Sequence, residues 1–489
     1  MLNVKENLIN SPLPELLNKV ITNDALRGLA IKLAEKKSYE ILVERTDSLC
    51  PKKAQEEKFC ILRNLLLAGD KATKNRNLSP EVRKKLLKLF IGKVLLGGND
   101  NRKDFEKRYG YRPPLFLTIS PGKACNLRCV GCYANSSASN LEKLDYAIVD
   151  RIINEKTNLW GSHFTVISGG EPLMWRSEGK DILNVAEKHN DNYFLMYTNG
   201  TLISEKVARR MAELGNITPA ISVEGFEEET DKRRGKGVHQ RILKAFENLR
   251  EAGVPFGISI TANRDNAEIV ISDEFVDFYF NKQGVMYGWI FQYMPIGRKF
   301  TLDMMITPEQ RVRMYEREKV LLEQKKLFIA DFWNSGALSS GCISAGRPGG
   351  YFYIDWNGDV MPCVFTPYST HNIKEVYNGG GDLNTILNSP FFEAIRKWQR
   401  DYGYEKPACQ VGNQIVPCPI RDHHFMFHNW VKNFHARPIN VEAEEALKDR
   451  SYLEGLVDYG KKVAELTDEI WDREYIEPER LSRAKVRQN

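Results

Sequence analysis

The sequence predicts an α/β protein whose core is a parallel sheet with helices on its outer side. Six short apolar runs, rich in β-branched and aromatic residues, predict the strands: 115–120, 163–168, 193–198, 219–224, 255–262 and 289–294. The stretches between them are long enough for a helix, as in Ser204–Leu214 and Gln240–Ala252. Repeated alternation of strand and helix indicates parallel strands that are buried on both faces.

Helices are expected before this core. Ser79-Pro80-Glu81 is typical of a helix start, with a capping side chain, a proline at the first position and an acid in the first turn. Apolar side chains then recur at helical spacing until Gly97-Gly98: Leu86, Leu87, Phe90, Val94 and Leu95. The same segment carries Arg83, Lys84, Lys85, Lys88 and Lys93. We interpret these as the solvated face of a packed helix, with contact to anionic lipid as the alternative.

After the core the alternation stops. Residues 351–363, YFYIDWNGDVMPC, predict a hairpin that turns at Asn357-Gly358. A loop-rich stretch with cysteines follows, and the end of the chain predicts charged, surface-exposed helix. The expected domains are a helical region at 1–110, the α/β core at 111–335, a cysteine-bearing domain at 336–435 and a charged helical tail at 436–489.

Length and composition agree with several domains of a globular protein. The chain has 489 residues, of which 42% are apolar and 27% charged. No apolar run is long enough to span a membrane, and the first residues, MLNVKENLINSPLPELL, lack the layout of a signal peptide. We expect a cytoplasmic protein, with peripheral membrane contact as the alternative. The net charge of +6 is modest and no basic stripe is interleaved with aromatics, so no nucleic-acid partner is expected.

Three of the nine cysteines, Cys125, Cys129 and Cys132, lie together directly after the first predicted strand. Thiolates bind soft metals, and in a reducing compartment such clustering favours metal over disulfides. Four thiolates would complete a four-iron cluster, so three leave one iron open for chemistry. The spacing favours an iron–sulfur cluster, with a zinc site completed by a distant residue as the alternative.

The spacing Cys-x3-Cys-x2-Cys after the first strand, followed by Ser168-Gly169-Gly170-Glu171-Pro172 after the second, resembles the radical S-adenosylmethionine (SAM) superfamily over roughly residues 110–300. The resemblance implies a partial (β/α)6 TIM-type barrel and a [4Fe–4S] cluster on Cys125, Cys129 and Cys132 with an open iron site. It implies reductive cleavage of SAM to a 5′-deoxyadenosyl radical, which abstracts hydrogen from an unactivated carbon. A low-potential electron donor such as ferredoxin or flavodoxin is then the expected partner.

The same resemblance implies which residues contact SAM. Those matched to the family's motifs are Gly169, Gly170, Glu171, Pro172, Thr198, Asn199, Ser222, Glu224 and Arg234. Glu171 would bind the amino group of SAM and Arg234 its carboxylate, while turn or loop roles are the structural alternatives for Asn199, Ser222 and Arg234. The family often has an aromatic residue that contacts adenine before the third cysteine. Here that residue is Gly131, so the adenine contact stays unassigned, and the following Tyr133 is expected to point elsewhere.

A second cysteine set lies in the C-terminal part. Gly341-Cys342 and Gly358-x4-Cys363 resemble the SPASM and twitch domains, which hold auxiliary [4Fe–4S] clusters. A full SPASM domain has seven cysteines, whereas this part has Cys342, Cys363, Cys409 and Cys418, so one auxiliary cluster is expected. The alternatives are a mixed site with His423, His424 and His428, or a packing role for Cys409 and Cys418. Cys50 and Cys60 are interpreted as structural.

The substrate is the least defined part of the sequence. Relatives with SPASM domains commonly modify peptides or protein side chains, whereas others act on small molecules such as cofactors, sugars or lipids. The apolar helix at 86–96 and the aromatic stretch at 423–430 favour a lipid chain, with peptide or protein side-chain modification as the alternative. Peptide-modifying relatives often carry an N-terminal winged helix, which the first 110 residues do not predict.

A non-catalytic iron–sulfur electron-transfer protein is the alternative of another class, and the intact motifs at 168–172, 197–200 and 230–235 argue against it. No catalytic acid, base or radical-quenching residue stands out.

Overall fold

The computed structural model describes residues 23–44, 49–75, 78–95, 97 and 100–488. The expectation drawn from the first seventeen residues lies outside this part. None of the described helices combines the length and the apolar character needed to cross a membrane.

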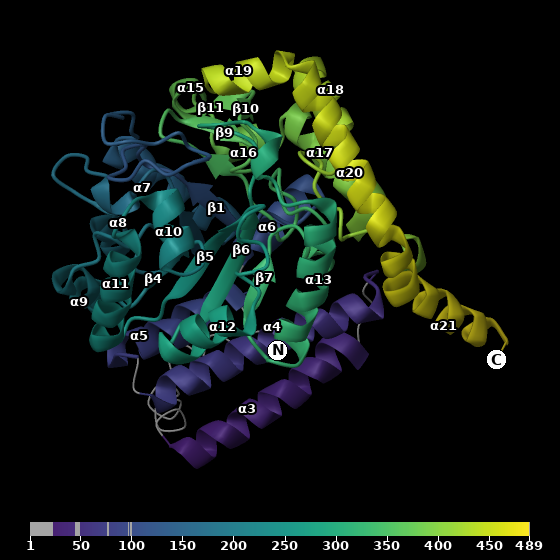
Figure 1. Cartoon of the computed structure of the whole chain (residues 1–489), viewed down its shortest axis with the longest axis horizontal. Helices are drawn as coiled ribbons and strands as arrows, with labels where there is room; N and C mark the ends of the chain where they lie inside the picture. The colour runs from purple at the N-terminus through teal and green to yellow at the C-terminus, as the bar shows by residue number, and fades with distance from the viewer. Residues whose placement is uncertain (1–22, 45–48, 76–77, 96, 98–99, 489) are drawn as a thin grey trace.

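The six predicted strands are present and lie side by side in chain order (Figure 1). Their bounds are β1 Phe116–Ile119, β2 Phe164–Ile167, β3 Tyr193–Thr198, β4 Ile217–Val223, β5 Gly257–Ala262 and β6 Tyr287–Gln292. Each pairs in parallel with the next, for example Phe116 with Phe164 and Ile119 with Ile167. A seventh parallel strand, β7 (Ile329–Asp331), extends the sheet beside β6. All carboxyl ends therefore meet at one edge, where the predicted motifs lie.

Helices connect these strands and cover the sheet. They are α7 Tyr146–Trp160, α8 Ile182–Lys188, α9 Glu205–Leu214, α10 Glu227–Arg234, α11 Val238–Ala252, α12 Asp273–Val276, η4 Asp277–Lys282 and α13 Pro308–Glu323. Two short 3-10 turns, η3 Pro172–Met174 and η5 Leu302–Met304, follow β2 and β6. The predicted fold class, an α/β core with a parallel sheet, is confirmed, and its hydrogen-bonded strand order is that of an open sheet.

The N-terminal region is helical in its described part. It comprises α3 Asp24–Tyr39, η1 Glu40–Glu44, α4 Lys52–Lys74, α5 Pro80–Lys85, η2 Leu86–Leu95 and α6 Asp100–Tyr109. The predicted start at Ser79 is confirmed, because its hydroxyl accepts the Val82 N–H. Phe90 packs on Phe164 and Tyr193 at the amino ends of β2 and β3. The apolar face of this segment therefore belongs to the core, and Figure 1 shows α3 and α4 crossing below the sheet.

The predicted hairpin is formed by β8 (Tyr353–Ile354) and β9 (Asp359–Met361), which pair antiparallel. Gly358 turns it with a φ of 90°, a conformation that side chains rarely adopt. β8 also pairs in parallel with β1, which the sequence did not predict. The sheet thus runs β11-β9-β8-β1-β2-β3-β4-β5-β6-β7, with β11 at His371–Asn372. The C-terminal part is continuous with the core sheet.

The remaining elements surround this hairpin and one flank of the core. They are α14 Gly336–Ser339, β10 Tyr368–Ser369, α15 Ile373–Asn378, α16 Leu383–Leu387, α17 Pro390–Gln399, η6 Arg400–Tyr404, η7 Ala408–Gln410, α18 His424–Asn433, β12 Arg437–Pro438, α19 Val441–Lys448, α20 Arg450–Trp471, η8 Asp472–Ile476 and α21 Glu477–Gln488. The tail is helical, and besides its exposed charged side chains it has a buried apolar face. α20 buries Leu456, Val463 and Trp471 and packs on α13 and α18, because its apolar residues recur at helical spacing.

Candidate functional site

The loop after β1 places Cys125, Cys129 and Cys132 close together. Burial raises the pKa of the Cys125 thiol to about 12, and the charges of Glu171, Cys129 and Cys132 act in the same direction. Asn199 Nδ2 lies 3.8 Å from Cys125 Sγ and the Leu127 N–H lies 3.4 Å from it. These N–H donors would stabilise a bound thiolate.

The surroundings of the three thiols fit an anionic iron–sulfur cluster. Burial acts to lower the pKa of Arg234, but the charges of Glu224, Cys129 and Cys132 overcome it and raise the pKa. A buried cation thus faces two of the thiols. Among the described residues no three His, Cys, Asp or Glu side chains are arranged for a single metal ion. In a four-iron cluster each thiolate binds a different iron, so its ligands do not converge on one point.

Arg298, in the loop that follows β6, holds the cysteine loop and was not found from the sequence. Its Nη1 donates to the Cys129 carbonyl over 2.5 Å, its Nε donates to Asn135 Oδ1, and Nη2 donates to the Ser136 carbonyl. Gly297 lies so close that a Cβ there would be 2.5 Å from the Cys132 carbonyl oxygen. The signal in the sequence is a Gly-Arg pair after the sixth predicted strand.

Gly169 and Gly170 dock the end of β2 against the cysteine loop. The Gly170 N–H donates to the Gly122 carbonyl over 3.0 Å, and the Glu171 N–H donates to the Ala124 carbonyl over 2.8 Å. A Cβ on Gly170 would lie 2.3 Å from the Ala124 oxygen. The structure therefore explains these glycines by backbone approach to the loop, whereas the sequence suggested approach to a ligand.

Glu171 is a buried acidic residue that follows β2 and contacts the carboxyl end of β3. Its Oε1 accepts from Thr198 Oγ1 at 2.7 Å and from the Leu173 N–H, and its Oε2 accepts from the Asn199 N–H at 2.8 Å. Pro172 begins η3 and fixes this turn. Burial raises the pKa of Glu171 despite these bonds. A carboxylate can accept about four bonds. The described bonds occupy three of these positions.

Glu224 and Arg234 form a buried ion pair at the end of β4. Arg233 Nη1 lies 2.5 Å from Glu224 Oε1, and Arg234 Nε lies 2.7 Å from the same oxygen. Glu224 Oε2 and Arg233 Nε are buried without a described partner. Ser222 is half-buried two residues earlier on the strand. The structure thus pairs Glu224 with Arg234, the residue that the resemblance assigned to the SAM carboxylate, and leaves polar atoms for a further polar ligand.

The residue before the third cysteine is glycine because a ring fills its space. Gly131 has a φ of 62°, and a Cβ there would lie 2.7 Å from Tyr293 Cε2. Tyr133 turns away from this position, as expected, and its hydroxyl lies 2.8 Å from Ser168 Oγ.

The structure brings together three of the four C-terminal cysteines. Burial raises the pKa of Cys418, and the charges of Asp422, Cys342 and Cys363 add to this effect. The Tyr351 hydroxyl lies 3.0 Å from Cys363 Sγ. Cys409 lies on η7, which packs against η8 and α21.

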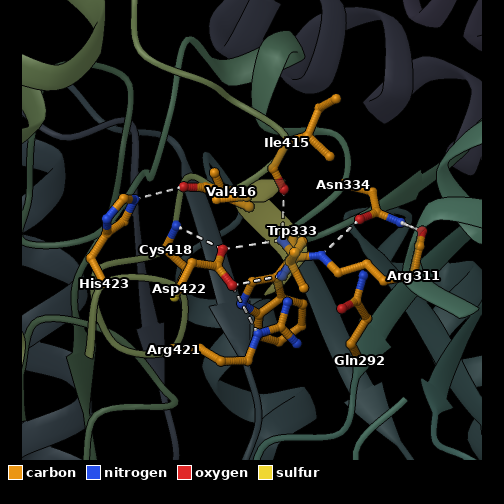
Figure 2. Close-up of polar contacts among 12 residues, drawn as sticks. Gln292, Arg311, Trp333, Asn334, Ile415, Val416, Cys418, Arg421, Asp422 and His423 are labelled. Atoms are coloured by element: carbon orange, nitrogen blue, oxygen red, sulfur yellow. Dashed lines mark hydrogen bonds and ion pairs between the residues drawn. The ribbon is translucent and has the colours of Figure 1, made fainter. Parts of the chain in front are cut away.

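Two buried arginines flank these thiols with N–H groups that have no described partner. Arg421 is fully buried beside Cys418, and its Nη1 and Nη2 are unpartnered. Its guanidinium lies 4.5 Å from the Trp333 ring centre, and Nε bonds Asp422 (Figure 2). Arg347 has an unpartnered buried Nε and interacts electrostatically with Cys342. Buried donors of this kind cost about 1–3 kcal/mol each when unpaired, so an anionic sulfur-rich cluster fits between them.

Two of the candidate histidines bond to the backbone. His423 Nε2 lies 2.9 Å from the Val416 carbonyl oxygen, as Figure 2 shows, and His424 Nδ1 lies 2.6 Å from that of Ile420. His428 lies one helical turn further on α18. The His423 and His424 rings therefore have hydrogen-bond partners in the backbone.

Comparison with known proteins defines the class. Residues 119–268 match the Radical SAM superfamily, and residues 342–411 match the SPASM domain, an iron–sulfur cluster-binding domain. The chain is therefore a radical SAM enzyme with a SPASM domain. Its cofactors are a [4Fe–4S] cluster and SAM in the core, and auxiliary iron–sulfur in the C-terminal part.

Individual proteins and structures are also similar to this chain. Mycofactocin maturase MftC of Mycobacterium tuberculosis is 29% identical over 299 residues, which cover 59% of this chain and 74% of the relative. AdoMet-dependent heme synthase of Methanosarcina barkeri is 27% identical over 281 residues, covering 51% of this chain and 77% of the relative. The crystal structure of Streptococcus suis SuiB bound to S-adenosylmethionine matches with a TM-score of 0.51 at 18% identity, over 76% of this chain and 90% of that one. This last likeness concerns the fold.

Proposed function

We propose that this enzyme modifies a peptide or protein side chain by abstracting hydrogen from an unactivated carbon. The observation that carries the proposal is the match to mycofactocin maturase, which extends over most of both chains. It supports the peptide alternative over the lipid reading that the sequence favoured.

The domain boundaries and the residues that hold the first cluster and SAM are part of this proposal. Residues 111–335 form the core domain and 336–435 the SPASM-type domain, between a helical region at 1–110 and a tail at 436–489. The first cluster is held by Cys125, Cys129 and Cys132. SAM contacts Gly169, Gly170, Glu171, Pro172, Thr198, Asn199, Ser222, Glu224 and Arg234. When bound, these cofactors supply the radical chemistry, and a low-potential donor such as ferredoxin or flavodoxin supplies the electron. Glu171 would orient the ammonium of SAM, and Arg234, which is paired with Glu224, would bind its carboxylate.

Aromatic side chains at the carboxyl ends suit an apolar part of the substrate. Phe365, from the SPASM-type domain, lies with its ring centre 6.1 Å from that of Tyr133 and 5.9 Å from that of Phe291. Trp333 follows β7 and lies 5.2 Å from Phe365. Tyr133, Phe291 and Phe365 are only half-buried. Tyr133 directly follows Cys132, and Phe365 lies two residues after Cys363. The proposal therefore puts the substrate side chain beside these rings.

The features that favoured a lipid chain serve packing. Phe90 packs on the strands of the core, and Phe427 is 1% exposed within the same apolar cluster.

The first test is SAM cleavage. Anaerobically reconstituted, reduced enzyme is expected to release 5′-deoxyadenosine, and more of it when the correct peptide is added. Cys125→Ala should abolish release because a cluster ligand is lost, whereas Cys60→Ala, on α4 outside both cysteine sets, should retain it.

Mass spectrometry then identifies the substrate class. Short peptides encoded beside the gene are expected to change in mass with enzyme and SAM but not with the Cys125→Ala variant. Unchanged peptides together with a mass change in a lipid extract would refute the peptide proposal and leave the radical SAM class intact.

A further inference from the structure

The C-terminal cysteine set has a gap in its ligands. Cys342, Cys363 and Cys418 interact with one another. Cys409, the fourth in sequence, is carried by η7, whose neighbours are η8 and α21. A four-iron cluster with a thiolate on every iron needs four cysteines, so these three leave one iron without a thiolate.

Cys50 reaches this place from the N-terminal region. It stands just before α4, and its Sγ lies 2.6 Å from Ser340 Oγ, two residues before Cys342. Lys58 Nζ lies 3.4 Å from Cys50 Sγ and 3.1 Å from Ser340 Oγ. α4 also packs on α14, which ends at Ser339. The thiol is thus held at the loop that carries Cys342.

Arg347 provides an independent observation at the same point. The side chain is 4% exposed, and its Nη1 donates to the Ser340 carbonyl over 3.1 Å. Its charge interacts with Cys342, Tyr404 and Cys50, which oppose the lowering of its pKa by burial. Its Nε has no described partner. A buried guanidinium that interacts with both thiols and has an N–H to spare is expected to donate it to a sulfur anion held by them.

We propose that Cys50 is the fourth thiolate of the auxiliary cluster, together with Cys342, Cys363 and Cys418, and that Cys409 is not a ligand. Binding forms one Fe–S bond, and the Cys50 thiol loses its proton to solvent. Lys58 and Arg347 compensate part of the negative charge. The cluster would then join the N-terminal helices to the C-terminal domain. This proposal is independent of the substrate.

The test removes the first cluster, with Cys125→Ala, Cys129→Ala and Cys132→Ala in the full chain, so that the auxiliary cluster is measured alone. This background should bind about four irons per chain. Adding Cys50→Ala should lower the iron content and change the electron paramagnetic resonance and Mössbauer spectra. Adding Cys409→Ala or Cys60→Ala should change neither. An unchanged spectrum with Cys50→Ala, or a change with Cys409→Ala alone, overturns the proposal.

Alkylation of the native holoenzyme tests the ligand without a variant that could misfold. Iodoacetamide labelling followed by peptide mapping should leave Cys50 unmodified in the loaded enzyme and label it after the iron is chelated. Cys409 should be labelled to the same extent in both states. Labelling of Cys50 in fully loaded enzyme, with Cys409 protected, would reverse the assignment.

Discussion

Gly131 occupies a position where neither the backbone nor the surroundings accept a side chain. Its φ of 62° is in the left-handed region, and a Cβ would lie 2.7 Å from Tyr293 and 3.1 Å from Met304. Tyr293 itself is 2% exposed, so it has little room to move away. The loop that carries the third cysteine is therefore shaped by residues beyond β6.

Gly131→Ala is expected to lower the free energy of unfolding of the iron-free protein by about 2 kcal/mol or more, because backbone strain and overpacking add. Urea denaturation followed by circular dichroism measures the loss. Gly110→Ala is the matched control, since its φ is 77° but nothing lies within 4 Å of its Cβ. It should cost about 1–2 kcal/mol. Equal losses in the two variants would show that Tyr293 moves aside without cost.

At this scale the sequence marked candidate residues but could not show their contacts. It marked Gly169, Gly170 and Glu171 by their place after a strand. It could not show that the glycines meet the loop backbone, or that Arg298 clamps that loop, because these contacts join segments from different strands. Only the fold brings them together.

At the scale of elements, three helical segments that are distant in sequence, α4, α13 and η8, are joined by a buried series of hydrogen bonds. Tyr475 of η8 donates to Glu57 Oε1 of α4 over 2.6 Å, and its hydroxyl lies 2.9 Å from that of Tyr315 on α13. Burial raises the pKa of Glu57 to about 7, although Tyr475, Lys53 and Lys319 oppose the rise. The carboxyl group thus holds its proton when folded and loses it at lower pH when unfolded.

Glu57→Gln is expected to flatten the pH dependence of stability. Because the folded pKa is raised, the contribution of Glu57 to stability is complete below the ordinary value near 4.5 and is lost as pH rises to about 7. The loss is on the order of 3 kcal/mol for this group. Denaturation midpoints between pH 5 and 8 measure it, with Glu56→Gln on the same helix as the control. A variant whose midpoints fall as steeply as those of the wild type would contradict this account.

Strands with a long apolar run were predicted correctly from the sequence, whereas short strands that are fixed by pairing with a distant segment were missed. The runs for β1 to β6 were recognisable because each strand is buried on both faces. β7 and β8 have three and two residues, too few for a period to appear, and β8 is fixed by its pairing with β1. The tail was predicted to be surface-exposed because charged residues dominate its composition, and the apolar residues that form the buried face of α20 were overlooked.

For the whole molecule, the core and the C-terminal part are held by a shared sheet and by a buried ion pair. Arg311 of α13 meets Asp422 with Nη1–Oδ1 at 2.6 Å and Nη2–Oδ2 at 3.1 Å, both side chains being fully buried (Figure 2). Burial would raise the pKa of Asp422, but the charges of Arg311 and Arg421 hold it at about 2. Arg311 also donates to the Ile415 carbonyl. The pair therefore fixes the segment that carries Cys418 against the core.

Arg311→Met should lower the free energy of unfolding by about 3–5 kcal/mol, because Asp422 keeps its charge in a buried place with one cation fewer. The same helix offers a matched control. Arg313 pairs with Glu268 at 2.6 Å, but both side chains are 53% exposed, so Arg313→Met should cost about 1 kcal/mol or less. Urea denaturation at low and high salt separates the two, since screening should weaken the exposed pair and leave the buried pair unchanged. If both variants lost the same free energy of unfolding, the Arg311–Asp422 pair would not be what holds the C-terminal part on the core. Iron binding at Cys418 should then also survive Arg311→Met.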